Sequence, residues 1–302
     1  MPQINEINQE RIVVKSVGGF AHSLQQIAAG RMTRLRKVVE ASRRFVDEAT
    51  LILRELELER TKQLEKELGV KKAELKSRKK PQKGQQLPPE QLNIAIIVVT
   101  SNQGLAGSYN TDIIKKADPI IEKYKDADYF VLGTKGQAFF AKAARKHGLA
   151  YYPYNIPEEV TLDDLRPLIG MFYHYDQIFL LYSKYVNTVI REVVFVELTV
   201  PNIIVDEAKK ERVEGKFIFE PNVDELIKLM ETKLRYALFR QQILDSKLAL
   251  YSSQMMAMKT ASDNAGDLLK ELQLQYNKAR RKLIDKKIQE VQAGRSLWAD
   301  EE

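Results

Sequence analysis

The sequence lacks several residue types and patterns on which common functions depend. Its 302 residues include no cysteine, which excludes disulfides, thiolate nucleophiles and cysteine-based zinc sites. Only three histidines are present, too few for a histidine-rich metal centre. The least charged stretch contains six consecutive apolar residues, Ile94–Val99, which cannot span a bilayer. The first ten residues have neither the basic nor the apolar region of a signal peptide, so we expect a soluble, cytoplasmic chain.

Proline is nearly confined to the middle of the chain. Nine of the ten prolines lie between Pro81 and Pro221, and the tenth is Pro2. Because proline interrupts helices, this distribution predicts a helix, a mixed domain and a second helix. The predicted parts are an N-terminal coiled-coil helix (1–70), a basic linker or helix tip (71–91), a Rossmann-like α/β domain (92–221) and a C-terminal coiled-coil helix (222–302).

A 3.5-residue apolar repeat runs through the C-terminal segment. Alternating steps of four and three residues from Val223 to Leu283 meet sixteen apolar residues in eighteen positions, with tyrosine counted as apolar. This repeat is typical of one helix of a left-handed coiled coil. We expect the helix to begin after Pro221 and to end at Gly294. Its expected length of about 105 Å exceeds a domain of this size, so we expect it to project.

The N-terminal segment carries a matching repeat, in which ten of twelve positions are apolar. The predicted series is Val17, Ala21, Leu24, Ala28, Arg31, Leu35, Val38, Ser42, Phe45, Ala49, Ile52 and Leu56. Two such helices are expected to pair antiparallel, because each can then cover the apolar stripe of the other. The alternative is that two separate helices pack on the middle domain.

Positive charge is concentrated in three segments. Residues 71–83 carry seven Lys or Arg and one Glu, which predicts a solvated linker or helix tip, with a nucleic-acid-binding arm as the alternative. Residues 31–44 and residues 278–287 each carry six positive residues against one acidic residue. Solvated helix faces would explain these two zones, but the zones also suit an acidic partner surface.

The middle of the chain alternates between strand and helix patterns. The predicted strands are 94–100, 129–133, 149–152, 177–182 and 192–200, and the predicted helices are 111–124, 137–146 and 162–173. This order predicts a mostly parallel sheet that is covered by helices. The predicted fold class is therefore α/β plus a long antiparallel coiled coil, with the sheet inserted between the two paired helices.

Two glycine-containing turns follow predicted strands without matching a nucleotide-binding motif. Residues 104–107 read GLAG and residues 133–136 read GTKG, whereas GxGxxG and GxxxxGK[ST] are absent. Tight turns between strands and helices explain both segments. The acidic pair Asp163 and Asp164 stands at a predicted helix start, where aspartate caps the backbone. We therefore predict no catalytic residue, no metal site and no cofactor.

Motifs along nearly the whole chain resemble, in the same order, those of one known family. The longest is SQMMAMKTASDNAGDLLKELQLQYNKAR at residues 253–280. The others are VKSV at 14–17, TRLRK at 33–37, TSNQGLAGSYN at 100–110, GTKGQAFF at 133–140, YDQIFLLYSKYVN at 175–187 and FIFEPN at 217–222. On these residues the chain resembles the gamma subunit of F-type ATP synthase.

The chain also departs from that family's pattern. Gln103 and Gln254 stand where the family usually has arginine, and Ala106 stands where it often has cysteine. Arg280 and Arg281 replace the family's Arg-Gln pair. The lysine-rich stretch around residues 70–86 is expected to be an insertion.

The resemblance implies a non-catalytic central rotor stalk. Its coiled coil would stand inside a ring of three alpha and three beta subunits, and its α/β domain would lie at the foot, with the epsilon subunit, on the membrane c-ring. Rotation of the c-ring by protons would then drive the beta subunits through conformations of different nucleotide affinity. The expected location is peripheral, on the cytoplasmic face of a bacterial cell membrane, with neither bilayer insertion nor nucleic acid as a partner.

The resemblance also implies particular contact residues. Those expected to contact the stator are Arg34, Arg36, Met258, Lys259, Arg280, Arg281, Lys282, Lys286 and Lys287. Those matching the family motif of the foot domain are Gly104, Leu105, Gly107, Tyr109 and Asn110. Two other functions stay open from the residues alone. One is a basic coiled-coil tether or nucleic-acid-binding protein, and the other is a nucleotide-dependent enzyme, which the missing phosphate loop disfavours.

Overall fold

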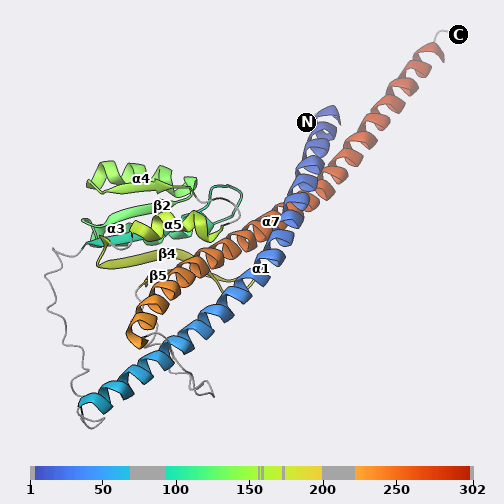
Figure 1. Ribbon diagram of the computed structural model, residues 1–302. Helices are drawn as coiled ribbons and strands as arrows, with labels where there is room; N and C mark the ends of the chain where they lie inside the picture. The colour runs from blue at the N-terminus through green and yellow to red at the C-terminus, as the bar shows by residue number, and fades with distance from the viewer. Residues whose placement is uncertain are drawn as a thin grey trace. The chain divides into compact units, whose positions relative to one another are not determined.

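A computed structural model describes residues 4–68, 93–155, 157, 160–171, 174–198 and 222–299 (Figure 1). The described residues form two compact units. Unit 1 comprises the residues up to Gly30 and those from Gln254 onward, and unit 2 extends from Arg31 to Ser253. Two helices contribute to both units, α1 (Ile4–Leu68) and α7 (Val223–Ala299).

Unit 2 contains a mixed five-stranded sheet. Its strands are β1 (Ile94–Val99), β2 (Asp128–Leu132), β3 (Tyr151–Tyr154), β4 (Gln177–Tyr185) and β5 (Arg191–Glu197), in the order β3-β2-β1-β4-β5. The pairings β1–β2, β1–β4 and β2–β3 are parallel, and β4–β5 is antiparallel. Strand β1 is central, with Val98 opposite Val131 on one side and Leu181 on the other. The prediction of a mostly parallel sheet is confirmed.

The antiparallel edge follows from a short connection between β4 and β5. The side chain of Asn187 accepts hydrogen bonds from the backbone N–H of Val189 (2.9 Å) and Ile190 (2.7 Å), which closes a tight turn. A connection this short can join only antiparallel strands, because a parallel pair needs a crossover of a dozen or more residues.

Helices cover both faces of the sheet. The shorter helices are α3 (Tyr109–Lys123), α4 (Thr134–His147) and α5 (Leu162–Met171). On one face, residues of α3 and α4 pack with Ile96, Val98 and Val131, and α7 adds Leu244 and Leu248. On the other face, α5 and α7 share a core with the strands, formed by Ala95, Ile97, Phe130, Leu165, Leu168, Leu180, Phe239 and Ile243. Helix α7 therefore contributes to both cores.

Helices α1 and α7 contact each other in opposite directions within each unit. In unit 2, Arg43 pairs with Asp245, whereas Arg60, further along α1, pairs with Asp224, earlier on α7. In unit 1, the Arg11 guanidinium lies 4.8 Å from the Tyr276 ring centroid. A Cβ on Gly18 would lie 3.0 Å from the Cβ of Ala265, so glycine permits a close helix approach there. The two helices are therefore antiparallel where they meet.

The predicted register of α7 agrees with burial over nearly its whole length. Every predicted position from Val223 to Ala279 is buried or half-buried. Leu283 is an exception, with 46% of its surface exposed. The predicted end at Gly294 is also wrong, because α7 continues to Ala299. A single glycine costs a helix only about 1 kcal/mol relative to alanine, so it does not end one by itself.

The predicted register of α1 is wrong at four of its twelve positions, whereas the other eight are buried or half-buried. Ala21, Ala28, Ser42, Ala49 and Leu56 are buried as predicted. The exposed positions of the predicted series are Val17, Val38, Phe45 and Ile52, at 42–58% exposure, while Val39, Val46 and Leu53 are buried at 0–6%. From Val39 onward the buried positions are separated by alternating steps of three and four residues, whereas the predicted series from Val38 onward alternates four and three. Both phases are apolar in the sequence, so periodicity alone could not separate them.

Element boundaries differ from the predictions by a few residues. Strand β3 lies two residues later than predicted, and β5 ends at Glu197 within the described residues. The lysine-rich segment at 71–91 and most of the motif at 217–222 lie outside the described residues. The predicted domain boundaries stay predictions.

Candidate functional site

The loop after β1 forms a tight junction with the turn after β2. The Thr100 hydroxyl donates to the carbonyl oxygen of Leu132 (2.7 Å) and accepts from the N–H of Gly136 (3.0 Å). A Cβ on Gly136 would lie 2.6 Å from the Thr100 Oγ1, and one on Gly133 would lie 2.4 Å from the Thr100 carbonyl oxygen. Gly133 also has φ of +96°. The GTKG turn therefore needs both glycines for close packing against β1.

The GLAG loop is anchored by a hydrogen bond of Asn110 and exposes the apolar side chain of Leu105. Asn110, at the start of α3, accepts from the N–H of Ser101 (3.0 Å) through its Oδ1. Leu105 has φ of +60° and is 62% exposed, and Gly107 has φ of +55°. Gly104 is exposed as well, so of the predicted foot-domain residues only Tyr109 is fully buried.

Three hydroxyl groups of α7 attach the α/β domain to that helix. The Tyr109 and Ser246 hydroxyls are hydrogen-bonded at 2.7 Å, and the Ser253 hydroxyl donates to the Ala106 carbonyl oxygen at 2.6 Å. The Ser252 hydroxyl donates to the carbonyl oxygen of Thr188 in the β4–β5 turn. Burial raises the pKa of Tyr109 to about 12, so this phenol stays protonated and neutral. Serines suit these positions because their short side chains let the helix approach the loops closely.

A partly buried ion pair joins α1 to α7 beside the sheet. Arg43 Nη2 donates to Asp245 Oδ1 at 2.7 Å across 202 residues of sequence. The Asp245 side chain is 5% exposed and that of Arg43 is 40% exposed. Burial raises the pKa of Asp245, and the Arg43 guanidinium opposes that shift. The pair therefore ties the two long helices to each other, and we call it the helix lock (Arg43 and Asp245).

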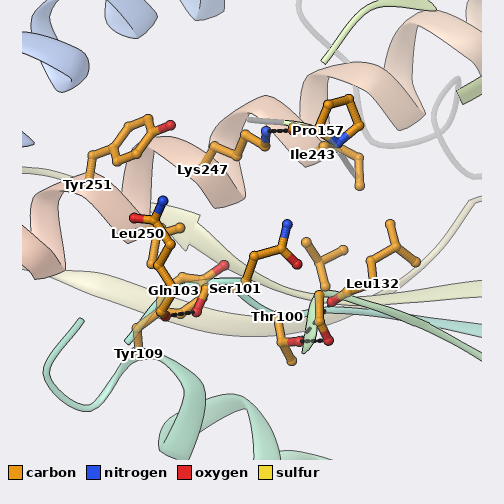
Figure 2. Close-up of a pocket in the computed structure, with 13 residues that line it drawn as sticks. Thr100, Ser101, Gln103, Tyr109, Leu132, Pro157, Ile243, Lys247, Leu250 and Tyr251 are labelled. Atoms are coloured by element: carbon orange, nitrogen blue, oxygen red, sulfur yellow. Dashed lines mark hydrogen bonds between the residues drawn. The ribbon is translucent and has the colours of Figure 1, made fainter. Parts of the chain in front are cut away.

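The carboxyl ends of β1 and β2 meet under α7 (Figure 2). Doubly wound sheets commonly bind nucleotides at this edge. Here a cavity of about 70 Å³ remains, lined by Thr100, Ser101 and Gln103 from the loop and by Lys247 and Tyr251 from α7. Ligand pockets for drug-sized molecules are about 300–1,000 Å³. The edge is thus used for packing a helix, and the Lys247 ammonium donates to the Pro157 carbonyl oxygen across it.

The basic zone of α7 (residues 278–287) lies on the solvent-exposed surface of unit 1. Every residue from 280 to 293 is exposed, including the predicted contact residues Arg280, Arg281, Lys282, Lys286 and Lys287. Lys286 Nζ lies 3.8 Å from Glu290 Oε1, a loose pair on the surface. This arrangement leaves a strongly cationic helix surface that a partner can reach.

The other predicted contact residues differ in exposure. Lys259 is exposed, whereas Met258 is 9% exposed and packs inside unit 1, which leaves little of it for a partner. In unit 2, Arg34 and Arg36 are exposed, and Arg36 Nε pairs with Glu40 Oε1 at 3.2 Å.

Comparison with known proteins identifies the family. A family model described as ATP synthase matches residues 3–296. The ATP synthase gamma chain of Psychrobacter sp. (strain PRwf-1) is 26% identical over 312 residues, which cover 97% of this chain and 98% of the relative. This chain belongs to the ATP synthase gamma-chain family. The gamma chain of Streptococcus pyogenes serotype M49 is 33% identical over 208 residues, 66% of this chain and 70% of the relative.

Solved structures share the gamma-chain fold. The central stalk and c-ring structure of Tetrahymena thermophila mitochondrial ATP synthase contains a chain that matches with a TM-score of 0.55 and 19% identity, covering 80% of this chain and 99% of that one. A chain in the Euglena gracilis mitochondrial OSCP/F1/c-ring structure matches with a TM-score of 0.52 and 13% identity, covering 89% and 94%. The matches do not support the nucleic-acid-binding alternative. None of the described helices is long and apolar enough to cross a membrane.

Sequence reasoning missed the residues that attach α7 to the rest of this gamma chain. Asp245, Ser246 and Lys247 interrupt an otherwise apolar helix segment between Ile243 and Leu250. Such a segment is expected to be buried, and a buried carboxylate needs a partner. The sequence could thus have indicated that Asp245 is paired, but several arginines of α1 would have been equal candidates.

Proposed function

We propose that this chain is the central rotor stalk subunit of an F-type ATP synthase, in which it couples proton-driven rotation of the c-ring to the conformational cycle of the beta subunits. The observation that carries the proposal is the family match over residues 3–296. The partners are three alpha and three beta subunits, an epsilon subunit and the c-ring. The complex places the chain peripherally on the cytoplasmic face of a membrane.

The shaft in this proposal is an antiparallel coiled coil of α1 and α7. Supporting it are the opposed contacts of the two helices and the 3.5-residue burial pattern of α7 from Val223 to Ala279. A helix of 77 residues with continuous backbone hydrogen bonds resists bending more than a loop does, so it can transmit a turning force.

Torque must pass from the α/β domain to this shaft. The hydroxyl contacts of Ser246, Ser252 and Ser253 attach the domain to α7, and the helix lock joins α7 to α1. Each is buried or partly buried, where hydrogen bonds and charge pairs are stronger than on the surface. The attachment therefore transmits rotation of the foot to both helices together.

The exposed cations are the proposed moving contacts with the stator. Residues 278–287 carry six positive residues and one acidic residue on a helix surface that the described part of the chain leaves largely exposed. Long flexible cations can exchange acidic partners during rotation without a fixed geometry. Chemistry at the nucleotide is assigned to the beta subunits, so the chain itself is a non-catalytic subunit that needs no cofactor.

Reconstitution tests the proposal. The chain is co-purified with alpha, beta and epsilon subunits of an F-type ATP synthase, and ATP-driven rotation of a bead attached to the foot domain is recorded. We expect a complex with three alpha and three beta subunits for one copy of this chain, and rotation in steps. A chain that fails to join the alpha–beta ring would contradict the proposal.

A further inference from the structure

A groove in unit 2 is not explained by the proposed rotor function. It lies between α1, α5 and α7 and has a volume of about 880 Å³. Val38 and Phe45 of α1 line it with Ile169 of α5 and Ala237 of α7. Val38 and Phe45 are 42% and 58% exposed, because they occupy the phase of α1 that does not pack on α7. The volume is within the range of pockets that enclose drug-sized molecules.

Four of the residues that line the groove are cations. Lys37, Arg166, Lys233 and Arg240 line it together with the apolar residues, Ser42 and Tyr236, and no carboxylate among the described residues does. Arg166 pairs with Asp163 at 3.0 Å on the exposed rim, which leaves three cations without a carboxylate partner among the described residues. The groove thus combines an apolar surface with uncompensated positive charge.

Arg240 provides a second observation. Its Nε is buried and makes no hydrogen bond to any described residue. A buried N–H without an acceptor costs free energy, and this donor is unsatisfied in the described part of the structure. Arg240 also lines a neighbouring cavity of about 440 Å³, which Val38 shares and to which Arg31, Arg34 and Lys247 add cations. Positive charge therefore surrounds Arg240 on both sides.

We propose that this groove binds an anionic amphiphile, whose phosphate or carboxylate head is held by Arg240 and Lys233 and whose alkyl chain packs on Val38 and Phe45. Guanidinium and ammonium groups recognise such heads through charge-assisted hydrogen bonds, and phosphate suits arginine best. Residues of three helices of one chain line the groove, and its volume of about 880 Å³ suits a small ligand better than a segment of a partner protein. A free amphiphile and a membrane lipid share this chemistry.

The test is isothermal titration calorimetry of the full chain with decyl phosphate, at concentrations below the critical micelle concentration of decyl phosphate. We expect saturable binding at one site, and also binding of decanoate. Decanol, decyltrimethylammonium and inorganic phosphate, each of which lacks either the negative head or the alkyl chain, should bind at least about tenfold more weakly. Equal affinity for decanol or for the cationic amphiphile would overturn the proposal.

Matched variants locate the site. Lys233→Gln and Phe45→Gln should each weaken decyl phosphate binding about tenfold. The controls are Lys228→Gln, an exposed lysine of α7 that does not line the groove, and Phe20→Gln, an exposed phenylalanine of α1 in unit 1. Both test residues are exposed, so the variants should fold, and their melting temperatures check this. Binding that is unchanged in the test variants, or reduced equally in the controls, would refute the site.

Two further arms identify the source of the ligand. If phosphatidylglycerol vesicles bind the chain and Lys233→Gln abolishes that binding, the ligand is a membrane lipid. If the variant leaves vesicle binding unchanged, the ligand of the groove is the free amphiphile. Vesicle binding without binding of monomeric decyl phosphate would show only that a chain with net charge +7 is attracted to an anionic surface, and this result would reject the proposal. Binding of a Leu-Glu repeat peptide but not of decyl phosphate would show that the occupant is a protein, which is also against it.

Discussion

Removing one member of the helix lock should destabilise the chain in a way that depends on pH. Arg43→Met leaves Asp245 as an unpaired carboxylate whose side chain is 5% exposed. Breaking a buried pair costs about 3–5 kcal/mol, but the Arg43 side chain is 40% exposed, so water screens the pair. We therefore expect a loss of about 2–3 kcal/mol in the free energy of unfolding at pH 7.

The second variant separates the charge effect from lost packing. Arg43→Met combined with Asp245→Asn removes both charges and should cost only about 1 kcal/mol, because no buried charge is left unpaired. Arg44→Met is the control, since Arg44 is the exposed neighbour on α1, and it should change stability by about 0.5 kcal/mol or less. The measurement is urea unfolding followed by circular dichroism.

The dependence on pH has a definite sign. Burial raises the pKa of Asp245 in the folded chain, and loss of Arg43 raises it further. A carboxyl with a raised folded pKa holds its proton more firmly when folded, so stability falls as pH increases above the unfolded pKa of about 3.9. The deficit of Arg43→Met should therefore be smaller at pH 5 than at pH 7. An equal deficit at both pH values, or a double variant as unstable as the single one, would refute the pairing.

Four other predictions test the register, the attachment, the stator contact and the absence of a nucleotide site. Val46→Asp should lower the free energy of unfolding by about 3 kcal/mol or more, whereas Phe45→Asp should lower it by under about 1 kcal/mol. Equal shifts in melting temperature would contradict the burial of Val46 in place of Phe45. Tyr109→Phe removes a buried hydrogen bond and should cost about 1 kcal/mol by urea unfolding, with no loss indicating that the bond is not formed. Charge reversal of Arg280 with Arg281 should weaken ATP-driven proton pumping in the reconstituted complex but leave the melting temperature of the free chain nearly unchanged; unaffected pumping would mean that these cations are only solvated. Equilibrium titration of the isolated chain with ATP and magnesium should show no micromolar affinity, and saturable binding in that range would contradict the assignment.

Local sequence patterns predicted the secondary structure of this chain well. The apolar run Ile94–Val99 is the central strand, and the alternation of strands and helices after it gives the parallel part of the sheet. The repeat from Val223 matches the burial of α7, because the same spacing of apolar residues continues along that helix as far as Ala279. Such patterns depend on neighbours within a few residues, which the sequence displays directly.

The sequence predicted only part of the candidate site. The motif resemblance led to Tyr109 and to the exposed cations of α7, but not to the residues that hold the foot to the shaft. The Tyr109–Ser246 contact joins residues 137 positions apart, and local spacing contains no information about such a pair. Exposure of the cations is set by where α1 fails to cover α7, which is likewise a tertiary property.

The sequence by itself determined which segments are helices or strands, the family to which the chain belongs, and the stripe of α7 that is buried. Only the tertiary structure decided the phase of α1, because Val38 and Val39 are equally apolar and the packed neighbours select Val39. It also decided that Arg43 pairs with Asp245, and that α7 covers the sheet edge where related architectures bind nucleotides. The physical reason is the same in each case. Local composition establishes which faces can be buried, whereas the free energy of burial and charge pairing depends on which distant face meets them.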